Sequence, residues 1–261
     1  MKAPRLILSL LALTSASSLS QGAAITQTFE SGEDTSNWGP GSVWQGGSTI
    51  ATFLDPSFGG ASAGAGSSAL QNFSRVFRDN TVGIDVTTAY TISLYAEVAL
   101  FENPANGQFE VMDGNLGANT AHVRIRTEDE GGGTFSFHWE AKNGGAWDDM
   151  GLEFLVGQPY HIEFAIDPEA LTYTPTISLV SQTGTVLDTS SLADPDLSFD
   201  QSVVTNGQNG ELHFYLQGSA GSVGAAVDNI NITNIPEPAL PGIIASATLA
   251  LGLRRRRMSA V

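Results

Sequence analysis

Hydrophobic and polar residues alternate along much of the chain with a period of two. The clearest run spans residues 90–100, where apolar side chains at even positions are separated by mostly polar or small ones. Successive side chains of a strand point to opposite faces, so this pattern predicts β-strands with one buried face. Further runs of the same kind span residues 122–126, 135–140, 160–167 and 212–217. No amphipathic helix is predicted between residues 25 and 235.

Glycine-containing turn signals separate these runs. Asp113-Gly114, Gly131-Gly132-Gly133 and Asn143-Gly144-Gly145 supply the positive φ angles that tight connections need. The Gly/Ala/Ser-rich segment Gly59–Ser68 is predicted to be a surface loop. Short strands at this spacing, each with one polar face, predict an all-β, antiparallel β-sandwich domain over residues 25–235.

The N-terminus has the organisation of a secretory signal peptide. Lys2 and Arg5 precede the apolar run Leu6–Leu13, and the small residues Gly22 and Ala24 occupy the −3 and −1 positions of a cleavage site. The run is too short for a membrane helix. We therefore expect residues 1–24 to be a signal peptide; the alternative is a buried N-terminal helix.

The C-terminal residues 236–261 combine three features in order. Pro236-Glu237-Pro238 precedes an apolar span and then Arg254-Arg255-Arg256-Arg257. This arrangement resembles a PEP-CTERM sorting signal. The resemblance implies processing by an exosortase-type enzyme and a destination at the cell surface or in the extracellular matrix.

A plain membrane anchor is the alternative for the same segment. As a helix, residues 241–253 would reach only about 20 Å, against a hydrocarbon core of about 30 Å. Under either hypothesis the positive-inside rule places the arginines on the cytoplasmic side and the preceding domain outside.

Charge is distributed unequally along the chain. Six of the 11 basic residues lie in the two end segments, which leaves five basic against 26 acidic residues in the body and a net charge of −21. This charge argues against nucleic acid and anionic lipid as partners, because both need clustered Lys and Arg. The charge suits solubility at a hydrated cell surface, with divalent cation binding as the alternative. Cysteine is absent, which excludes disulfides and thiolate zinc sites.

Two neighbouring segments carry a family resemblance. The hairpin Thr134–Ala141 with Asn143–Asp149 is followed by Gly157-Gln158-Pro159-Tyr160 and by a turn with Asp167. These features resemble the concanavalin-A-like lectin/glucanase superfamily. The resemblance implies a jelly-roll order of strands, and in lectins of this kind glycans bind on the concave sheet face or on the edge loops.

The two ends of the body carry a second resemblance. Thr28-Phe29-Glu30 with Trp38, and Ala226-Val227-Asp228-Asn229-Ile230, resemble the opening and closing strands of MAM domains and several carbohydrate-binding jelly rolls. The resemblance implies that first and last strands lie side by side and share a structural Ca²⁺, with Glu30 and Asp228 as its best ligands.

The position of Asp228 in the strand pattern bears on this calcium hypothesis. By parity Asp228 shares a face with Ile230, so we expect its carboxylate to point toward the core, where it needs a partner. The alternative is that it accepts hydrogen bonds from backbone amides.

Candidate ligand-binding residues lie on the polar positions of the predicted strands. His122, His138, His161 and His213 all have this parity, and strands adjacent in one sheet would group them with Arg124, Arg126 and Tyr215. Sugar rings stack on aromatic side chains and hydrogen-bond to polar ones. The candidates are Trp147, Tyr215, Arg124 and His138, and the alternative for each is an ordinary solvent-facing residue. Trp139 is expected in the core.

Catalytic motifs are not found in the sequence. The Glu-x-Asp-x-x-Glu motif of jelly-roll glucanases is absent, and Glu97 and Glu102 have the wrong spacing and opposite parity. No serine nucleophile elbow or His-Glu-x-x-His sequence occurs. We therefore expect no enzymatic activity.

The sequence leads to three ranked hypotheses of function. The first is a non-catalytic exported protein that is structural or adhesive in an exopolysaccharide matrix. The second is a carbohydrate-binding module with a specific glycan. The third, a divergent glycoside hydrolase, needs two carboxylates about 5–10 Å apart in a cleft. Expected partners are an exosortase-type enzyme, the membrane through the C-terminal span before processing, and a polysaccharide.

Overall fold

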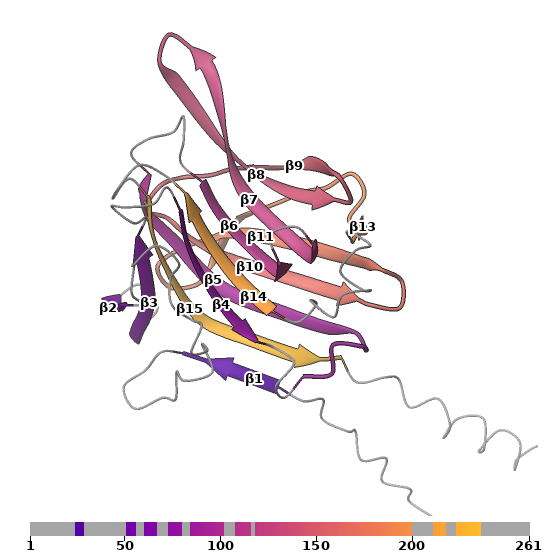
Figure 1. The fold of residues 1–261 in the computed structure, drawn as a ribbon. Coiled ribbons are helices and arrows are strands. Elements are labelled where there is room, and N and C mark those ends of the chain that lie inside the picture. The colour runs from indigo at the N-terminus through magenta and orange to yellow at the C-terminus, as the bar shows by residue number, and fades with distance from the viewer. Residues whose placement is uncertain are drawn as a thin grey trace, which may run out of the picture. The chain divides into compact units, whose positions relative to one another are not determined.

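The computed structural model describes residues 24–28, 51–55, 60–66, 73–79, 84–101, 108–115, 118–199, 211–217 and 223–235. All regular secondary structure within these residues is β-strand. The strands form two antiparallel sheets around a common apolar core, coloured by chain position in Figure 1. The predicted antiparallel β-sandwich is confirmed.

The first sheet, called sheet A, has nine strands. They are β1 (Ala24–Gln27), β2 (Ala51–Asp55), β3 (Gly60–Gly66), β5 (Tyr90–Phe101), β10 (Pro159–Asp167), β11 (Thr172–Val180), β12 (Val186–Thr189), β13 (Leu197–Ser198) and β15 (Val223–Asn234). Their order is β12-β11-β10-β5-β15-β3-β2, with β1 paired to β15 and β13 paired to β11.

The second sheet, called sheet B, has six strands. In spatial order they are β4 (Phe73–Asp79), β14 (Glu211–Gln217), β6 (Gln108–Asn115), β7 (Ala118–Gly131), β8 (Thr134–Asn143) and β9 (Ala146–Glu153). The chain passes between the sheets repeatedly, for example from β4 to β5, from β5 to β6 and from β14 to β15. Strands distant in sequence therefore become neighbours, as in a jelly roll.

The core is built from the apolar half of each alternating strand. In β5 the even-numbered residues from Tyr90 to Val98 are buried, whereas the odd-numbered ones are partly exposed. Trp139 is fully buried, as predicted, and its ring packs edge-on against Phe154 and Tyr160 at centroid distances of 5.8 and 5.4 Å. Each large side chain buried in this way contributes about 1.5–3 kcal/mol.

The first and last described strands are neighbours. β1 pairs with the C-terminal half of β15, where Ile25 lies opposite Ile232. β3 pairs with the N-terminal half of β15, where Ala63 lies opposite Val227. The predicted side-by-side arrangement holds for β1 and β15, while Phe29 and Glu30 of the expected opening strand lie outside the described residues.

A β-bulge in β15 decides which face Asp228 occupies. Asp228 pairs with Tyr95 and Asn231 pairs with Ser93, so the residues between them, Asn229 and Ile230, share one position of β5. Asn229 takes a φ of 49° there. Because the extra residue shifts the alternation by one, Asp228 lies on the outer face of sheet A while Ile230 faces the core. The expectation that Asp228 points toward the core was wrong.

Two predicted connections turn out to be strands. Residues 60–66 form β3, although their small side chains show no hydrophobic alternation. Asp113 and Gly114 lie inside β6 at a bulge rather than in a turn. The buried Asp113 carboxylate accepts hydrogen bonds from the Tyr90 hydroxyl and from Thr120 Oγ1, the latter at 2.6 Å. Those hydroxyls make a core-facing carboxylate tolerable. Burial of Tyr90 raises the pKa of its hydroxyl, and the Asp113 charge raises it further.

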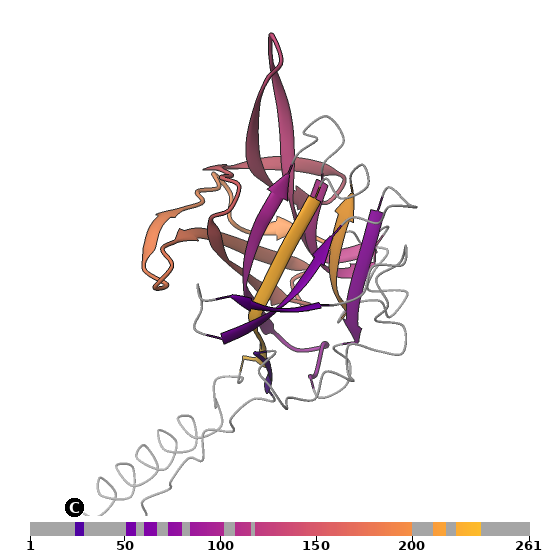
Figure 2. The ribbon, with the colours of Figure 1, turned by 90° about the vertical axis from the view of Figure 1, so that its left-hand side faces the viewer.

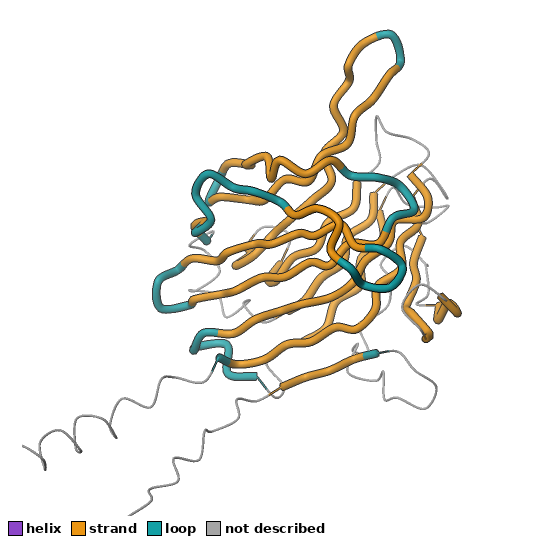
Figure 3. The backbone as a smooth tube through the Cα atoms, turned by 180° about the vertical axis from the view of Figure 1, so that it is seen from behind, coloured by secondary structure: helices purple, strands orange, loops and turns teal. Residues whose placement is uncertain are grey.

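Strands β7 and β8 extend beyond the rest of sheet B as a long hairpin. Figures 1 and 2 show it projecting from the sandwich, and Figure 3 shows the loop at its tip. Residues 128–134 are exposed, and Gly131, Gly132 and Gly133 all have positive φ. The turn predicted at these glycines is confirmed.

Candidate functional site on the outer face of sheet B

Sheet B has a polar outer face, on the side away from the core. The strand register places one residue from each of β14, β6, β7, β8 and β9 in a single row across it: Tyr215, Glu110, Arg124, Glu140 and Asp149. Neighbouring strands lie about 4.8 Å apart, so adjacent side chains in such a row can contact one another. The row defines the candidate site.

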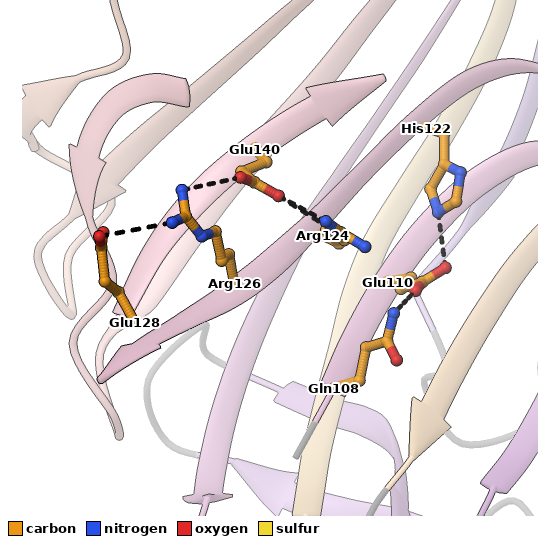
Figure 4. A network of polar contacts seen from close by, with 7 residues as sticks. All are labelled: Gln108, Glu110, His122, Arg124, Arg126, Glu128 and Glu140. Atoms are coloured by element: carbon orange, nitrogen blue, oxygen red, sulfur yellow. Dashed lines mark hydrogen bonds and ion pairs between the residues drawn. The ribbon is translucent and has the colours of Figure 1, made fainter. Parts of the chain in front are cut away.

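Glu140 is the anionic centre of this row. Arg124 approaches its Oε2 through Nε at 2.9 Å and Nη2 at 2.8 Å, and Arg126 Nη1 lies 3.3 Å from its Oε1 (Figure 4). The Glu140 side chain is only 6% exposed. A buried carboxylate is costly unless it is paired, and here two guanidinium groups provide that pairing.

Glu110 and His122 form a second buried pair. His122 Nε2 lies 2.6 Å from Glu110 Oε2, and both side chains are 5% exposed. Gln108 donates to the other carboxylate oxygen of Glu110 (Figure 4). Burial lowers the pKa of His122, although the Glu110 carboxylate acts in the opposite direction. His122 is therefore neutral at pH 7 and donates its Nε2 proton to Glu110.

Trp147 reaches from β9 across β8 to β7. The guanidinium carbon of Arg124 lies 3.8 Å from the centroid of the indole ring. The ring of His122 meets the indole edge-on at 4.7 Å. Cation–π contact and ring packing hold the half-buried indole in one orientation. Trp147 thus forms an ordered aromatic surface beside the polar row.

Tyr173 supports these strands from the core side. It belongs to β11 of sheet A, and its hydroxyl donates to the backbone carbonyls of His122 and Lys142. Lys142 lies opposite Trp147 in the pairing of β8 with β9, and the ring of His122 contacts the indole. Burial raises the pKa of Tyr173 well above its ordinary value, so the hydroxyl remains a donor at all physiological pH values.

The four predicted ligand-binding residues share this outer face. Arg124 and Trp147 are in direct contact. Tyr215 lies opposite Glu110 and is half-buried, and burial raises its pKa, with a further contribution from the Glu110 charge. His138 lies opposite Arg126, and its Nε2 is 3.2 Å from Ser136 Oγ. Their role in binding a ligand stays a prediction.

The predicted group of four histidines is divided between the two sheets. His122, His138 and His213 belong to sheet B, whereas His161 lies in β10 of sheet A. The His161 ring packs on Tyr95 of β5 with centroids 4.8 Å apart. The parity of all four was predicted correctly, but parity does not determine the sheet to which a strand belongs.

Two residues of the site were not selected from the sequence. Glu110 and Glu140 each lie on the polar side of an alternating strand, which is the only signal that the sequence gives. Their importance comes from the order β6-β7-β8, which places them on either side of Arg124. That order is a property of the fold.

Asp228, one of the two proposed calcium ligands, is 3% exposed. Its Oδ1 accepts a hydrogen bond at 2.7 Å from the backbone nitrogen of Asn229, the next residue of its own strand. Glu30, like Trp38, lies outside the described residues. Among the described residues, no three His, Cys, Asp or Glu side chains gather to hold a metal. The calcium site stays a prediction.

A pocket of about 360 Å³ lies at one end of sheet A, beside Asp167, Thr174, Asp196 and Ile235. Its carboxylates serve the local structure. Asp167 accepts hydrogen bonds from the backbone nitrogens of two residues in the following turn, and Asp196 accepts one from Thr174 Oγ1 at 2.9 Å.

The two targeting segments lie almost entirely outside the described part of the chain. This holds for residues 1–23 and for the whole C-terminal segment, including Pro236, Glu237, Pro238 and the four arginines. Within the described residues, no helix is long and apolar enough to cross a membrane.

No protein-family model matches the chain, and no curated protein matches it. Among solved structures, a protein of unknown function from Shewanella oneidensis MR-1 is 15% identical over 89% of this chain and 96% of its own, with a TM-score of 0.49. The CBM2 module of the evolved Dit of Lactobacillus casei BL23 phage J-1 is 12% identical over 82% and 98%, with a TM-score of 0.42.

A further similar structure is a GH131 β-glucanase catalytic domain from Podospora anserina. It is 13% identical over 70% of this chain and 78% of its own, with a TM-score of 0.47. At such low identities, function has to be argued from the side chains of the site.

Proposed function

We propose that the protein is a non-catalytic polysaccharide-binding protein that uses the outer face of sheet B. The observation that supports this proposal best is the fixed indole of Trp147 beside the paired polar groups of the row. A sugar ring offers an apolar face to such an aromatic surface and hydroxyl groups to neighbouring donors and acceptors. Side chains that are already ordered lose little entropy when a ligand binds.

The setting of this activity follows from the two ends of the chain. A secretory signal at residues 1–24 and a sorting signal at 236–261 would deliver the domain to the cell surface or the extracellular matrix. Polysaccharide binding there would give the protein the adhesive or structural role in an exopolysaccharide matrix that the sequence suggests.

Glycan binding by the domain 25–235 tests the proposal. We expect Trp147→Ala to weaken binding by about 30-fold or more, because removal of a central aromatic contact costs about 2 kcal/mol. Tyr95→Ala is the matched control, since it removes a half-buried aromatic ring from the outer face of sheet A. Equal losses in the two variants, or no binding by the wild type across a broad glycan array, would contradict the proposal.

One observation favours the glycoside hydrolase as a second candidate. Glu110 and Glu140 lie on the same face, separated by the single strand that carries Arg124. Two strand spacings are about 10 Å between backbones, and inverting glycosidases place their carboxyl groups about 6.5–9.5 Å apart. Release of new reducing ends from a bound polysaccharide, abolished by Glu140→Gln, would support hydrolysis, whereas binding without cleavage would support the non-catalytic function.

A further inference from the structure

The basic residues whose side chains the structure describes lie on one surface. The body carries only five, against 26 acidic residues. All three whose side chains the structure describes, Arg124, Arg126 and Lys142, belong to β7 and β8 and lie on the outer face of sheet B. Acidic residues occur on both outer faces, for example Glu140 on sheet B and Glu163 on sheet A, but the described strands of sheet A contain no Lys or Arg. The positive charges on this face are therefore opposite in sign to the net charge of the domain.

Lys142 differs from the two arginines in its surroundings. Arg124 and Arg126 are paired with Glu140, and Arg126 also approaches Glu128 at 3.4 Å. Among the described residues, no carboxylate lies within the 4.0 Å ion-pair distance of Lys142.

Lys142 also lies beside the aromatic surface. It is half-buried and stands directly opposite Trp147 in the pairing of β8 with β9. Its positive charge is close enough to His122 to lower the pKa of that imidazole. An ammonium group that no described carboxylate neutralises thus accompanies the ring on which the sugar is proposed to stack.

We propose that the polysaccharide is acidic and that Lys142 binds a sugar carboxylate beside Trp147. This inference rests on the proposed function and specifies its ligand class. A hydrogen bond to a charged group contributes about 1.5–3 kcal/mol, which corresponds to roughly 10–150-fold in affinity. The net charge of the body repels a polyanion at long range, so the selectivity has to come from this short-range contact.

Binding to alginate, polygalacturonate and hyaluronan, each compared with its carboxyl-reduced form, tests the inference. Carboxyl reduction removes the charge and keeps the sugar backbone. Binding is measured at about 0.15 M salt, which screens the repulsion between the domain and the polyanion beyond about 8 Å. The direct contact between Lys142 and the sugar carboxylate is screened much less. We expect at least one acidic polymer to bind at least 10-fold more tightly than its reduced form. Lys142→Gln should abolish the difference, and Lys142→Arg should retain it.

Gln158→Glu is the control for net charge, because it changes the charge by the same amount at an exposed turn residue. It should leave the preference for acidic polymers unchanged. If reduced and acidic forms bind equally and binding still depends on Trp147, the acidic-ligand inference is wrong while the proposed function stands. If no polysaccharide binds, both are wrong.

Discussion

Glu140 and Glu128 both pair with arginine, but their surroundings differ. Glu140 is 6% exposed, whereas Glu128 and its partner Arg126 are 46% and 39% exposed. We expect Glu140→Gln to lower the free energy of unfolding by about 1–3 kcal/mol, less than for a fully buried pair because Arg124 keeps some contact with water. Glu128→Gln should cost less than about 0.5 kcal/mol. Denaturant unfolding of both variants checks this, and equal losses would contradict the burial argument.

His122 makes stability depend on pH. Its pKa is lower in the folded protein than the ordinary value of 6.5, mainly because of burial. The unfolded chain therefore binds more protons as the pH falls through 6.5, so stability is complete above that value and decreases below it. His161 is shifted in the same direction and contributes with the same sign.

Thermal melts between pH 8 and pH 5.5 test this dependence. We expect the wild-type Tm to fall on acidification, by about 2–4 °C for each kcal/mol lost in a domain of this size. His122→Gln should reduce that fall, with His161→Gln as the comparison at a less buried site. A fall in Tm unchanged in both variants would assign the pH effect to other groups.

At the residue scale the sequence predicts the face of a side chain as long as the strand stays regular. The core position of Trp139 and the outward-facing positions of Arg124 and His138 follow from alternation alone. Asp228 does not, because the bulge at Asn229 inserts a residue into β15. Asp113 does not either, because its carboxylate is stabilised by hydroxyls of Tyr90 and Thr120, which only the fold brings near.

Between elements, the Tyr173 hydroxyl connects β11 of sheet A to β7 and β8 of sheet B. Tyr173→Phe removes the donor and leaves two buried carbonyls with one partner fewer, so we expect a loss of about 1–3 kcal/mol in the free energy of unfolding. The strands that carry His122 and Lys142 should also become less well ordered, which lowers glycan affinity.

Tyr160→Phe is the comparison for this effect. The Tyr160 hydroxyl also bonds to the backbone, at Glu153 and Leu155, and burial raises its pKa to about 12. Its contacts lie at the far end of β9, away from Trp147. Both variants should lose stability, but only Tyr173→Phe should weaken binding. An equal loss of affinity would mean that Tyr173 acts through global stability alone.

At the element scale, the existence of most long strands is predictable and their pairing is not. β5, β8 and β10 each contain many alternating residues, so the hydrophobic period identifies them. β3 is formed by Gly, Ala and Ser, and its strand conformation depends on pairing with β15 and β2. The site depends on pairing throughout, since Trp147 meets Arg124 only because β7, β8 and β9 are neighbours.

For the whole molecule, the calcium hypothesis predicts a linkage between metal and stability. If Ca²⁺ binds the folded domain through Glu30 and Asp228, a concentration 100 times the Kd adds about 2.7 kcal/mol, or about 5–10 °C in Tm. The measurement is a melt of the domain in excess Ca²⁺ and in chelator, with Asp228→Asn as the variant that should lose the shift. The same Tm in both solutions would remove the metal role of these residues.

The sorting segment should be separable from the fold, because the described contacts close the domain at Ile235. The Ile235 backbone nitrogen donates to the Ala89 carbonyl at 2.8 Å, and the Asn234 side chain bonds to the backbone of Asp85 at 2.9 and 2.6 Å. These bonds fix the end of β15 before the Pro-Glu-Pro sequence begins. Removal of residues 236–261 therefore leaves every described contact in place.

We expect the free energy of unfolding of the truncated chain to lie within about 0.5 kcal/mol of the full-length value, which is the range of ordinary surface changes. The truncated chain should also retain Trp147-dependent binding. Its location should change, because the segment proposed to engage the exosortase-type enzyme and the membrane is missing. Cell fractionation should find the full-length precursor with the membrane and the truncated chain in the medium. A truncated domain that fails to fold would show that residues beyond Ile235 belong to the sandwich, and an unchanged location would show that the C-terminal segment does not direct sorting.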